Sequence, residues 1–214
     1  MSERVATTRI AVFLDYQNSW HRTRELFGSP SAPPTMGHVH PRRLGERLCD
    51  LGRRIDPARS LSEVRVYRGQ PGLRSHHKLR LAFDRQTARW AALDDVSVHT
   101  RPLRYSPAER SREGRVVRWR GEEKGVDVLL ALHLALGARD DQYDVAVVVS
   151  ADTDLLPAIE EAVRIGKRVE TASWWKAPLP RRALHIPGRS LWNHYLDAAD
   201  FAAVRDDTDY LAQP

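Results

Sequence analysis

The sequence has a single cysteine, Cys49, which excludes an internal disulfide bond and a zinc site built from several cysteines. Long hydrophobic runs are also missing, because even the longest uninterrupted aliphatic stretches, such as residues 145–149, are far too short to span a bilayer. The first residues lack the apolar core of a signal peptide, so we expect a cytoplasmic protein without membrane contact. Lysine is scarce: it supplies only four of the 34 basic residues. The net charge of +6 therefore rests on arginine, whose planar guanidinium matches phosphate oxygens.

The order of apolar patterns along the 214 residues predicts one α/β domain with a C-terminal extension. Aliphatic runs typical of buried strands alternate with helical patterns, which indicates a parallel sheet covered by helices on both faces. The expected strands are residues 9–14, 64–67, 96–100, 145–149 and 168–172, and the expected helices are residues 17–27, 42–51, 73–93, 124–136 and 155–165. The last forty residues give a weaker pattern, and we expect residues 206–214 to form a loosely held acidic tail.

Four aspartates stand beside or inside apolar runs, where a carboxylate is costly to bury. Asp15 ends the first strand, Asp152 and Asp154 follow the strand at residues 145–149, and Asp127 lies in a helix that is apolar nearly all round. An ionised carboxylate in such surroundings needs a partner or a metal ion. If the strands before Asp15 and Asp152 are neighbours where the strand order reverses, these acids converge on one crevice. The pattern therefore favours a site for a hard cation such as Mg²⁺ or Mn²⁺.

The segment from residue 101 to residue 120 holds seven arginines and two glutamates, interleaved with Tyr105 and Trp119. Basic residues alternating with aromatic ones suit single-stranded nucleic acid, although a solvated arginine-rich surface explains the segment equally well. Among the tryptophans, we expect Trp20 and Trp90 in the core and regard Trp119, Trp174 and Trp175 as the candidates for stacking on bases.

Five ordered blocks make the chain resemble a known family. They are AVFLDYQN at residues 11–18, VRVYRG at 64–69, RPLRY at 101–105, EKGVDVLLAL at 123–132 and VVVSADTDLLPAIE at 147–160. In this order they resemble the NYN family, a branch of the PIN-like ribonuclease superfamily. The resemblance implies a PIN-like, Rossmannoid sheet of five parallel strands, an acidic pocket that binds Mg²⁺ or Mn²⁺, and cleavage of RNA. On this basis residues 1–173 are the NYN domain, and residues 174–214 are an extension packed on it or trailing from it.

Carried onto this chain, the family's metal-site acids match Asp15, Asp127 and Asp152, with Asp154 close by and Asn18 in support. Ser150, at the end of a strand, could orient a carboxylate. Many relatives carry an acid where this chain has His133. That residue lies about 120° around the helix from Asp127, so we expect it to be a packed or surface histidine rather than a ligand.

These residues predict a divalent-metal-dependent endoribonuclease that acts on single-stranded or locally unpaired RNA. The expected contacts with the RNA backbone are Arg68, Arg115, Arg118, Arg120 and Lys124. The strongest alternative is a catalytically weak RNA-binding or regulatory module with the same fold. A haloacid-dehalogenase-like phosphatase also uses aspartates after a strand, in an early DxD motif. It is disfavoured because this chain has Gln17 at the position of the second aspartate of such a motif. The sequence leaves the oligomeric state open, a homo-oligomer included.

Each acid also has a purely structural interpretation. Asp15 could be an N-cap, Asp152 and Asp154 could be a cap and a first-turn acid, and Asp127 could interact favourably with the positive end of its helix dipole.

Overall fold

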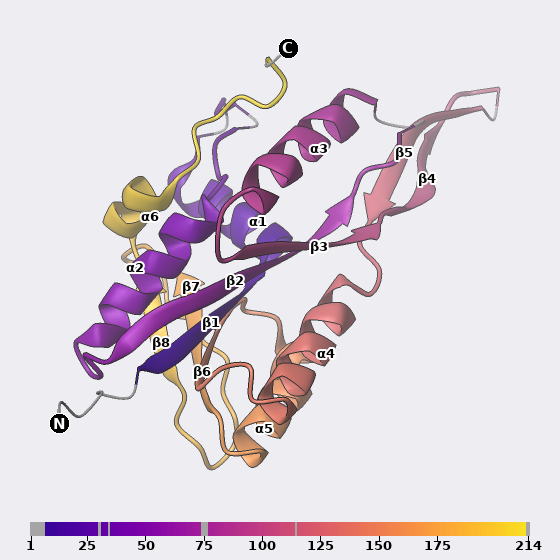
Figure 1. Ribbon diagram of the computed structural model, residues 1–214. Coiled ribbons are helices and arrows are strands. Elements are labelled where there is room, and N and C mark those ends of the chain that lie inside the picture. Colours follow the sequence, from indigo (N-terminus) through magenta and orange to yellow (C-terminus); the bar gives the residue numbers. More distant parts are fainter. Residues whose placement is uncertain (1–6, 30, 34, 74–76, 114, 213–214) are drawn as a thin grey trace, which may run out of the picture.

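In the computed structural model the chain folds around one sheet of six parallel strands, with helices on both faces (Figure 1). The structure describes residues 7–29, 31–33, 35–73, 77–113 and 115–212, without the side chains of Arg110 and Arg118. The strands of the main sheet are β1 (Thr8–Asp15), β2 (Arg59–Gln70), β3 (Val96–Pro102), β6 (Val145–Val149), β7 (Arg168–Trp174) and β8 (Trp192–Leu196). The helices are α1 (Tyr16–Phe27), α2 (Pro41–Arg53), α3 (His77–Ala91), α4 (Val126–Arg139), α5 (Leu156–Arg164) and α6 (Ala198–Val204), with a 3₁₀ turn, η1 (Thr153–Leu155).

The strand order is β3-β2-β1-β6-β7-β8, so the chain builds outward from β1 in one direction and later returns to the other side of it. Strand order therefore reverses between β1 and β6, which pair in parallel from Ile10 with Val145 to Leu14 with Val149. The expected neighbourhood of these two strands is confirmed. It brings Asp15 and Ser150, the residues that follow Leu14 and Val149, together at the carboxyl ends of these two strands, where α/β proteins bind ligands.

The unbroken aliphatic strands form two cores, one on each face of the sheet. Alternate residues of β1 point to opposite faces, so that Val12 packs under α1, α2, α3 and α6, while Phe13 packs under α4 and α5. All five residues of β6 are buried, as expected for a strand covered on both sides. No helix within the described ranges is long and apolar enough to cross a membrane.

The C-terminal region departs from two expectations. The sheet has six strands rather than five, because residues 192–196 pair in parallel with β7 at its edge. The expectation of a loose tail is wrong for residues 206–210, since Asp206 and Tyr210 are both buried. The Asp206 carboxylate accepts hydrogen bonds from Tyr210 Oη at 2.7 Å and from Trp90 Nε1 at 3.3 Å, which fixes this segment on α3.

The arginine-rich segment forms an antiparallel hairpin of β4 (Arg104–Arg110) and β5 (Val116–Glu122). This hairpin belongs to a separate two-stranded sheet and extends away from the main sheet beyond β3 (Figure 1). Only residues 123–125 connect β5 to α4, the helix that carries Asp127. An exposed cationic ribbon and an acidic helix are thus joined by three residues.

Candidate functional site

Asp15 lies where β1 ends and α1 begins, and both of its carboxylate oxygens accept hydrogen bonds. Oδ1 accepts from the backbone N–H of Asn18 at 3.1 Å, so Asp15 is the N-cap of α1 as one interpretation required. Oδ2 accepts from Ser150 Oγ at 2.9 Å, across the reversal point between β1 and β6. Capping therefore uses one oxygen of Asp15, while the other oxygen faces the neighbouring strand.

The environment of Asp15 favours its protonated form. Burial raises the pKa of Asp15 to about 6, and the negative charges of Asp152 and Asp127 raise it further, against the two hydrogen bonds that lower it. Carboxylates influence each other in this way only when they are near. Three of the four predicted aspartates thus interact at one edge of the sheet.

The loop after β6 holds Asp152 and Asp154 through a chain of hydrogen bonds. Ser150 Oγ, which donates to Asp15, accepts from the backbone N–H of Asp152 at 3.1 Å. Asp152 Oδ1 in turn accepts from the backbone N–H of Asp154 at 2.9 Å and caps the 3₁₀ turn η1. Asp152 is half-buried, whereas Asp154 is exposed. Ser150 is therefore the residue that links β6 and the acidic loop to Asp15.

Asp127 occupies the first turn of α4, directly after a sharp change of chain direction. The N-cap of α4 is Gly125, in the left-handed conformation with φ of 76°, and it has no side chain to cap the helix. Asp127 supplies the negative charge that the helix N-terminus favours, and it is half-buried. The same charge raises the pKa values of Asp15 and Glu123, so its helix-dipole role does not exclude it from the acidic site.

Glu123 is a fifth acid of this site that the sequence pattern did not single out. Its Oε1 accepts a hydrogen bond from the backbone N–H of Gly69, at the end of β2. Burial raises the pKa of Glu123 to about 7, and the charges of Asp15 and Asp127 contribute. A Cβ at Gly69 would lie 2.7 Å from Glu123 Oε1 and 2.3 Å from Leu103 Cδ2, so a larger residue there would displace these two side chains. The only sequence signals were that glycine and a glutamate just before KGVD.

The five acids do not form a closed metal cage. Among the described residues, no three His, Cys, Asp or Glu side chains are close enough together to hold a metal ion. The charges of Asp127 and Asp152 act on Asp15, but among the described residues the three carboxylates do not form the tight multi-ligand cluster that the sequence suggested. Their hard oxygen donors fit an ion such as Mg²⁺, which keeps several waters and uses only one or two protein carboxylates.

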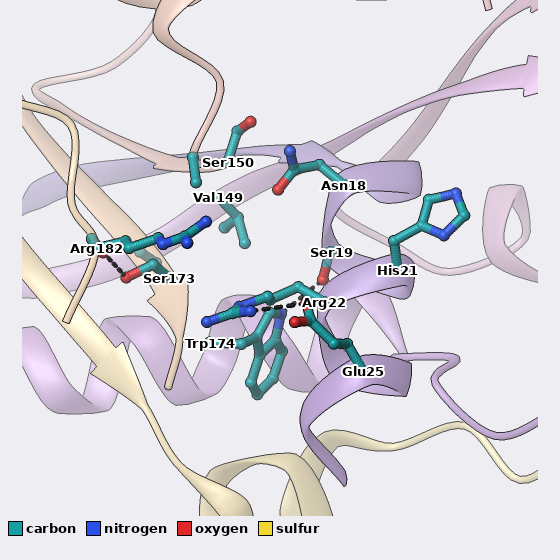
Figure 2. Close-up of a pocket in the computed structure, with 12 residues that line it drawn as sticks. Asn18, Ser19, His21, Arg22, Glu25, Val149, Ser150, Ser173, Trp174 and Arg182 are labelled. Carbon is teal, nitrogen blue, oxygen red and sulfur yellow. Dashed lines mark hydrogen bonds and ion pairs between the residues drawn. The ribbon is translucent and has the colours of Figure 1, made fainter. Parts of the chain in front are cut away.

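A pocket of about 340 Å³ lies beside this site, between α1 and the ends of β6 and β7. Asn18 and Ser150 line it next to the acids. Figure 2 shows the guanidinium groups of Arg22 and Arg182 reaching into the pocket from opposite sides. Arg22 also pairs with Glu25 at 2.7 Å. Neither arginine was predicted, because Arg22 looked like an ordinary helical residue and Arg182 belongs to the extension beyond residue 173.

Of the predicted phosphate contacts, Arg68 has a different role. Its guanidinium carbon lies 4.3 Å from the ring centre of Phe83 and 4.6 Å from that of Tyr16, and its Nη1 donates to Gln86 at 2.6 Å. Cation–π contacts and a hydrogen bond thus enclose this arginine. The guanidinium is therefore engaged in internal contacts rather than free on the surface, and a phosphate contact by Arg68 stays a prediction.

The other predicted cations lie on the surface. Arg115, Arg120 and Lys124 are exposed, and Arg120 makes a long ion pair of 3.7 Å with Glu122. The side chain of Arg118 lies outside the described part of the chain, although its backbone pairs with Glu109 within the hairpin. The hairpin therefore presents an exposed basic face, as a nucleic-acid track requires.

His133 packs away from the acids, as expected. Its Nδ1 is 3.1 Å from Tyr67 Oη, and its ring contacts that of His99 edge-on at 4.6 Å. Among the tryptophans, Trp119 is exposed on the hairpin, but Trp174 is buried in the core and is excluded as a base-stacking residue.

A family model for the NYN domain matches residues 9–184. The chain belongs to the NYN domain family. This membership gives it a nuclease-type fold and, at the coarse level, the function of a nuclease, which is a hydrolase. The match extends past residue 173 to include Arg182.

Two other comparisons gave little beyond the family. No curated protein matches the sequence of this NYN domain. A crystal structure of a protein of unknown function, VPA0982 from Vibrio parahaemolyticus RIMD 2210633, is similar with 16% identity, over 80% of this chain and 85% of the other, at a TM-score of 0.47.

Proposed function

We propose that this NYN domain is a divalent-metal-dependent endoribonuclease that cleaves single-stranded or locally unpaired RNA. The observation that carries the proposal is the electrostatic coupling of Asp15 with Asp152 and Asp127, at the point where strand order reverses. Acids that are gathered at such a point gain from a bound cation, because a cation relieves their mutual repulsion.

In this mechanism one or two of the carboxylates of Asp15, Asp127 and Asp152 would bind Mg²⁺ or Mn²⁺ directly and the others would act through its water molecules, with Asp154 at the rim. When bound, the ion would lower the pKa of a water molecule and neutralise charge on the phosphate. Ser150 orients Asp15 through its hydroxyl, which leaves Asp15 Oδ1 on the α1 cap. Arg22 and Arg182 would bind the RNA phosphates beside the acids, and Asn18 would support them as a hydrogen-bonding group.

The hairpin would extend this phosphate path. Exposed Arg115 directly precedes β5, exposed Arg120 lies on it and exposed Lys124 follows it, with Trp119 among them. Exposed arginines beside an aromatic ring suit an unpaired strand, whose bases can stack and whose phosphates remain accessible. A rigid duplex offers no unstacked base to Trp119, so we expect single-stranded RNA to be preferred.

The deciding experiment incubates the purified protein with structured and unstructured RNAs in Mn²⁺, in Mg²⁺ or in EDTA. Asp152→Asn keeps the shape of the side chain and removes one ligand charge, so cleavage should fall by at least about a hundredfold. Asp94→Asn is the matched control, since Asp94 is exposed and precedes β3, at the N-terminal ends of the parallel strands and away from the acids. Full cleavage in EDTA, or an Asp152→Asn variant as active as the control, would contradict the mechanism.

A second function is favoured by one observation, namely that the carboxylates form no ready three-ligand cluster among the described residues. A catalytically weak RNA-binding module would need the basic surfaces and not the cation. In the same experiment such a module binds RNA in all three conditions and cleaves it in none.

A further inference from the structure

The pocket between α1 and the ends of β6 and β7 has a floor of buried side chains. Val149, Ala172 and Trp174 line the pocket and are buried, so they close it toward the core. Trp174 Nε1 donates a hydrogen bond to Ser19 Oγ at 2.7 Å, which ties α1 to β7 across this floor. A ligand therefore enters from the solvent side and stops at the floor.

The two arginines of this pocket come from different elements (Figure 2). Arg22 belongs to α1, is half-buried and pairs with Glu25 at 2.7 Å. Arg182 lies in the segment after β7, where its backbone carbonyl accepts a hydrogen bond from Ser173 Oγ at 2.7 Å. This bond fixes the segment on β7, so the segment forms one wall of the pocket while α1 forms another. Two guanidinium groups on separate walls can bind the oxygens of one phosphate together.

Strand order arranges the pocket, the acids and the hairpin in a row. The pocket lies at β6 and β7, Asp15 lies at the end of β1, and the hairpin extends beyond β3 (Figure 1). Ser150 lines the pocket and donates to Asp15 at 2.9 Å, so the pocket and the acids are adjacent. An RNA strand that runs from the hairpin across the acids therefore reaches this pocket last.

We propose that the pocket of Arg22 and Arg182 binds the terminal phosphate of an RNA strand, so that the nuclease engages RNA by a phosphorylated end. The inference rests on the proposed function, since the acids must act on the same strand. A phosphate monoester carries about −1.5 to −2 charge at pH 7, whereas an internal phosphodiester carries a single charge. The monoester thus competes better with Glu25 for Arg22 while it also binds Arg182. A chain end needs only one way out of the pocket, which suits a closed floor.

The test measures binding in EDTA, so that it does not depend on cleavage. Oligouridylates with a 5′-phosphate, with a 3′-phosphate or with hydroxyl groups at both ends carry a fluorophore on an internal base, and anisotropy gives each dissociation constant. One phosphorylated oligomer should bind about tenfold more tightly than the hydroxyl oligomer, and the end that carries its phosphate gives the direction of the strand. A methyl ester on that phosphate, which leaves a single charge, should remove most of the gain.

Two substitutions should move this preference in opposite directions. Arg182→Ala should remove most of the gain from the terminal phosphate. Glu25→Gln should increase it several-fold, because Arg22 loses its competing partner and the exposed Glu25 side chain is not needed for packing. Glu161 and Arg164 form a matched exposed pair, three residues apart on α5, so Glu161→Gln and Arg164→Ala are the controls and should leave the preference unchanged.

Equal binding of all three oligomers by the wild type, or a preference that survives Arg182→Ala, would overturn the terminal-phosphate pocket. Phosphate-selective binding without metal-dependent cleavage would refute the nuclease mechanism alone. Metal-dependent cleavage by a protein that binds all three oligomers equally would refute the terminal-phosphate pocket alone.

Discussion

The Ser150 hydroxyl donates a 2.9 Å hydrogen bond to Asp15 across the boundary between β6 and β1, although 135 residues separate them in the chain. The same Oγ accepts from the backbone N–H of Asp152. Ser150 thereby lowers the pKa of one acid and holds the backbone of another. The consequences for catalysis and stability can be measured.

Ser150→Ala should shift the acid limb of the pH–rate profile to higher pH. The Ser150 hydrogen bond lowers the pKa of Asp15, which is about 6 in the intact site, so its loss raises that pKa. We expect cleavage at neutral pH to fall about tenfold, as for other residues that orient a ligand. Ser60→Ala, at an exposed position of β2, is the control and should leave the profile in place.

Without metal, Asp15→Asn should be more stable than the wild type at neutral pH. An unfolded aspartate ionises near pH 3.8 and the native Asp15 near pH 6, so between these values the native state binds more protons. The free energy of unfolding of the wild type therefore falls as pH rises through this window, and asparagine does not titrate. We expect a gain on the order of 1–2 kcal/mol above the window, because asparagine caps α1 about as well as aspartate does.

Urea unfolding in EDTA across the window measures this difference, and Mn²⁺ provides the second arm. Mn²⁺ at about a hundred times its dissociation constant should stabilise the wild type by about 2.7 kcal/mol and the variant much less. Parallel pH curves for both proteins, together with no effect of Mn²⁺ on either, would leave Asp15 as a helix cap only.

Removing the two pocket arginines should weaken RNA binding in a salt-dependent manner. The double substitution Arg22→Ala and Arg182→Ala should flatten the slope of log affinity against log salt by about one for each phosphate that the variant no longer binds. Arg164→Ala is the control, since Arg164 is exposed in the last turn of α5, near the N-terminal ends of the parallel strands and away from the pocket. A slope equal to that of the control would show that the pocket holds no phosphate.

The hairpin gives a separate prediction. Alanine at Arg115, Arg118 and Arg120 should weaken RNA binding about tenfold or more at low salt and flatten the salt slope, with cleavage at saturating RNA little changed. An equal charge removed at Arg54, Arg139 and Arg164, near the C-terminal ends of α2, α4 and α5, is the control. Unchanged affinity together with abolished cleavage would exclude the hairpin as the RNA track.

The parts of the fold that could be predicted are those where side-chain pattern and burial coincide. The run RIAVFLD and the run VAVVV are buried on both faces, so their apolar character indicates parallel central strands. Once these two strands are neighbours, the residues at their ends must meet, which is why Asp15, Ser150 and Asp152 could be grouped beforehand. A carboxylate after a buried strand is informative because little else explains its cost.

The rest depends on contacts that leave no periodic signal. β8 has the sequence WNHYL and is half exposed at the edge of the sheet. Its polar residues interrupt the apolar run by which a buried strand is recognised in a sequence. Glu123 gains its raised pKa from burial and from Gly69, far away in the chain. Arg22 and Arg182 line the same pocket because the fold places the segment after β7 beside α1. Such pairings follow from tertiary packing, which local sequence does not encode.

The three-residue connector between β5 and α4 has a consequence for how this domain can vary in length. Buried Val126, Leu130 and Leu134 anchor α4 in the core, so one residue inserted between Glu122 and Val126 would change the path of the connector rather than turn the helix. The same change would also displace Glu123 from Gly69. At the distal turn of the hairpin, extra residues would alter neither. The connector therefore tolerates little change in length, whereas the far end of the ribbon is free to lengthen.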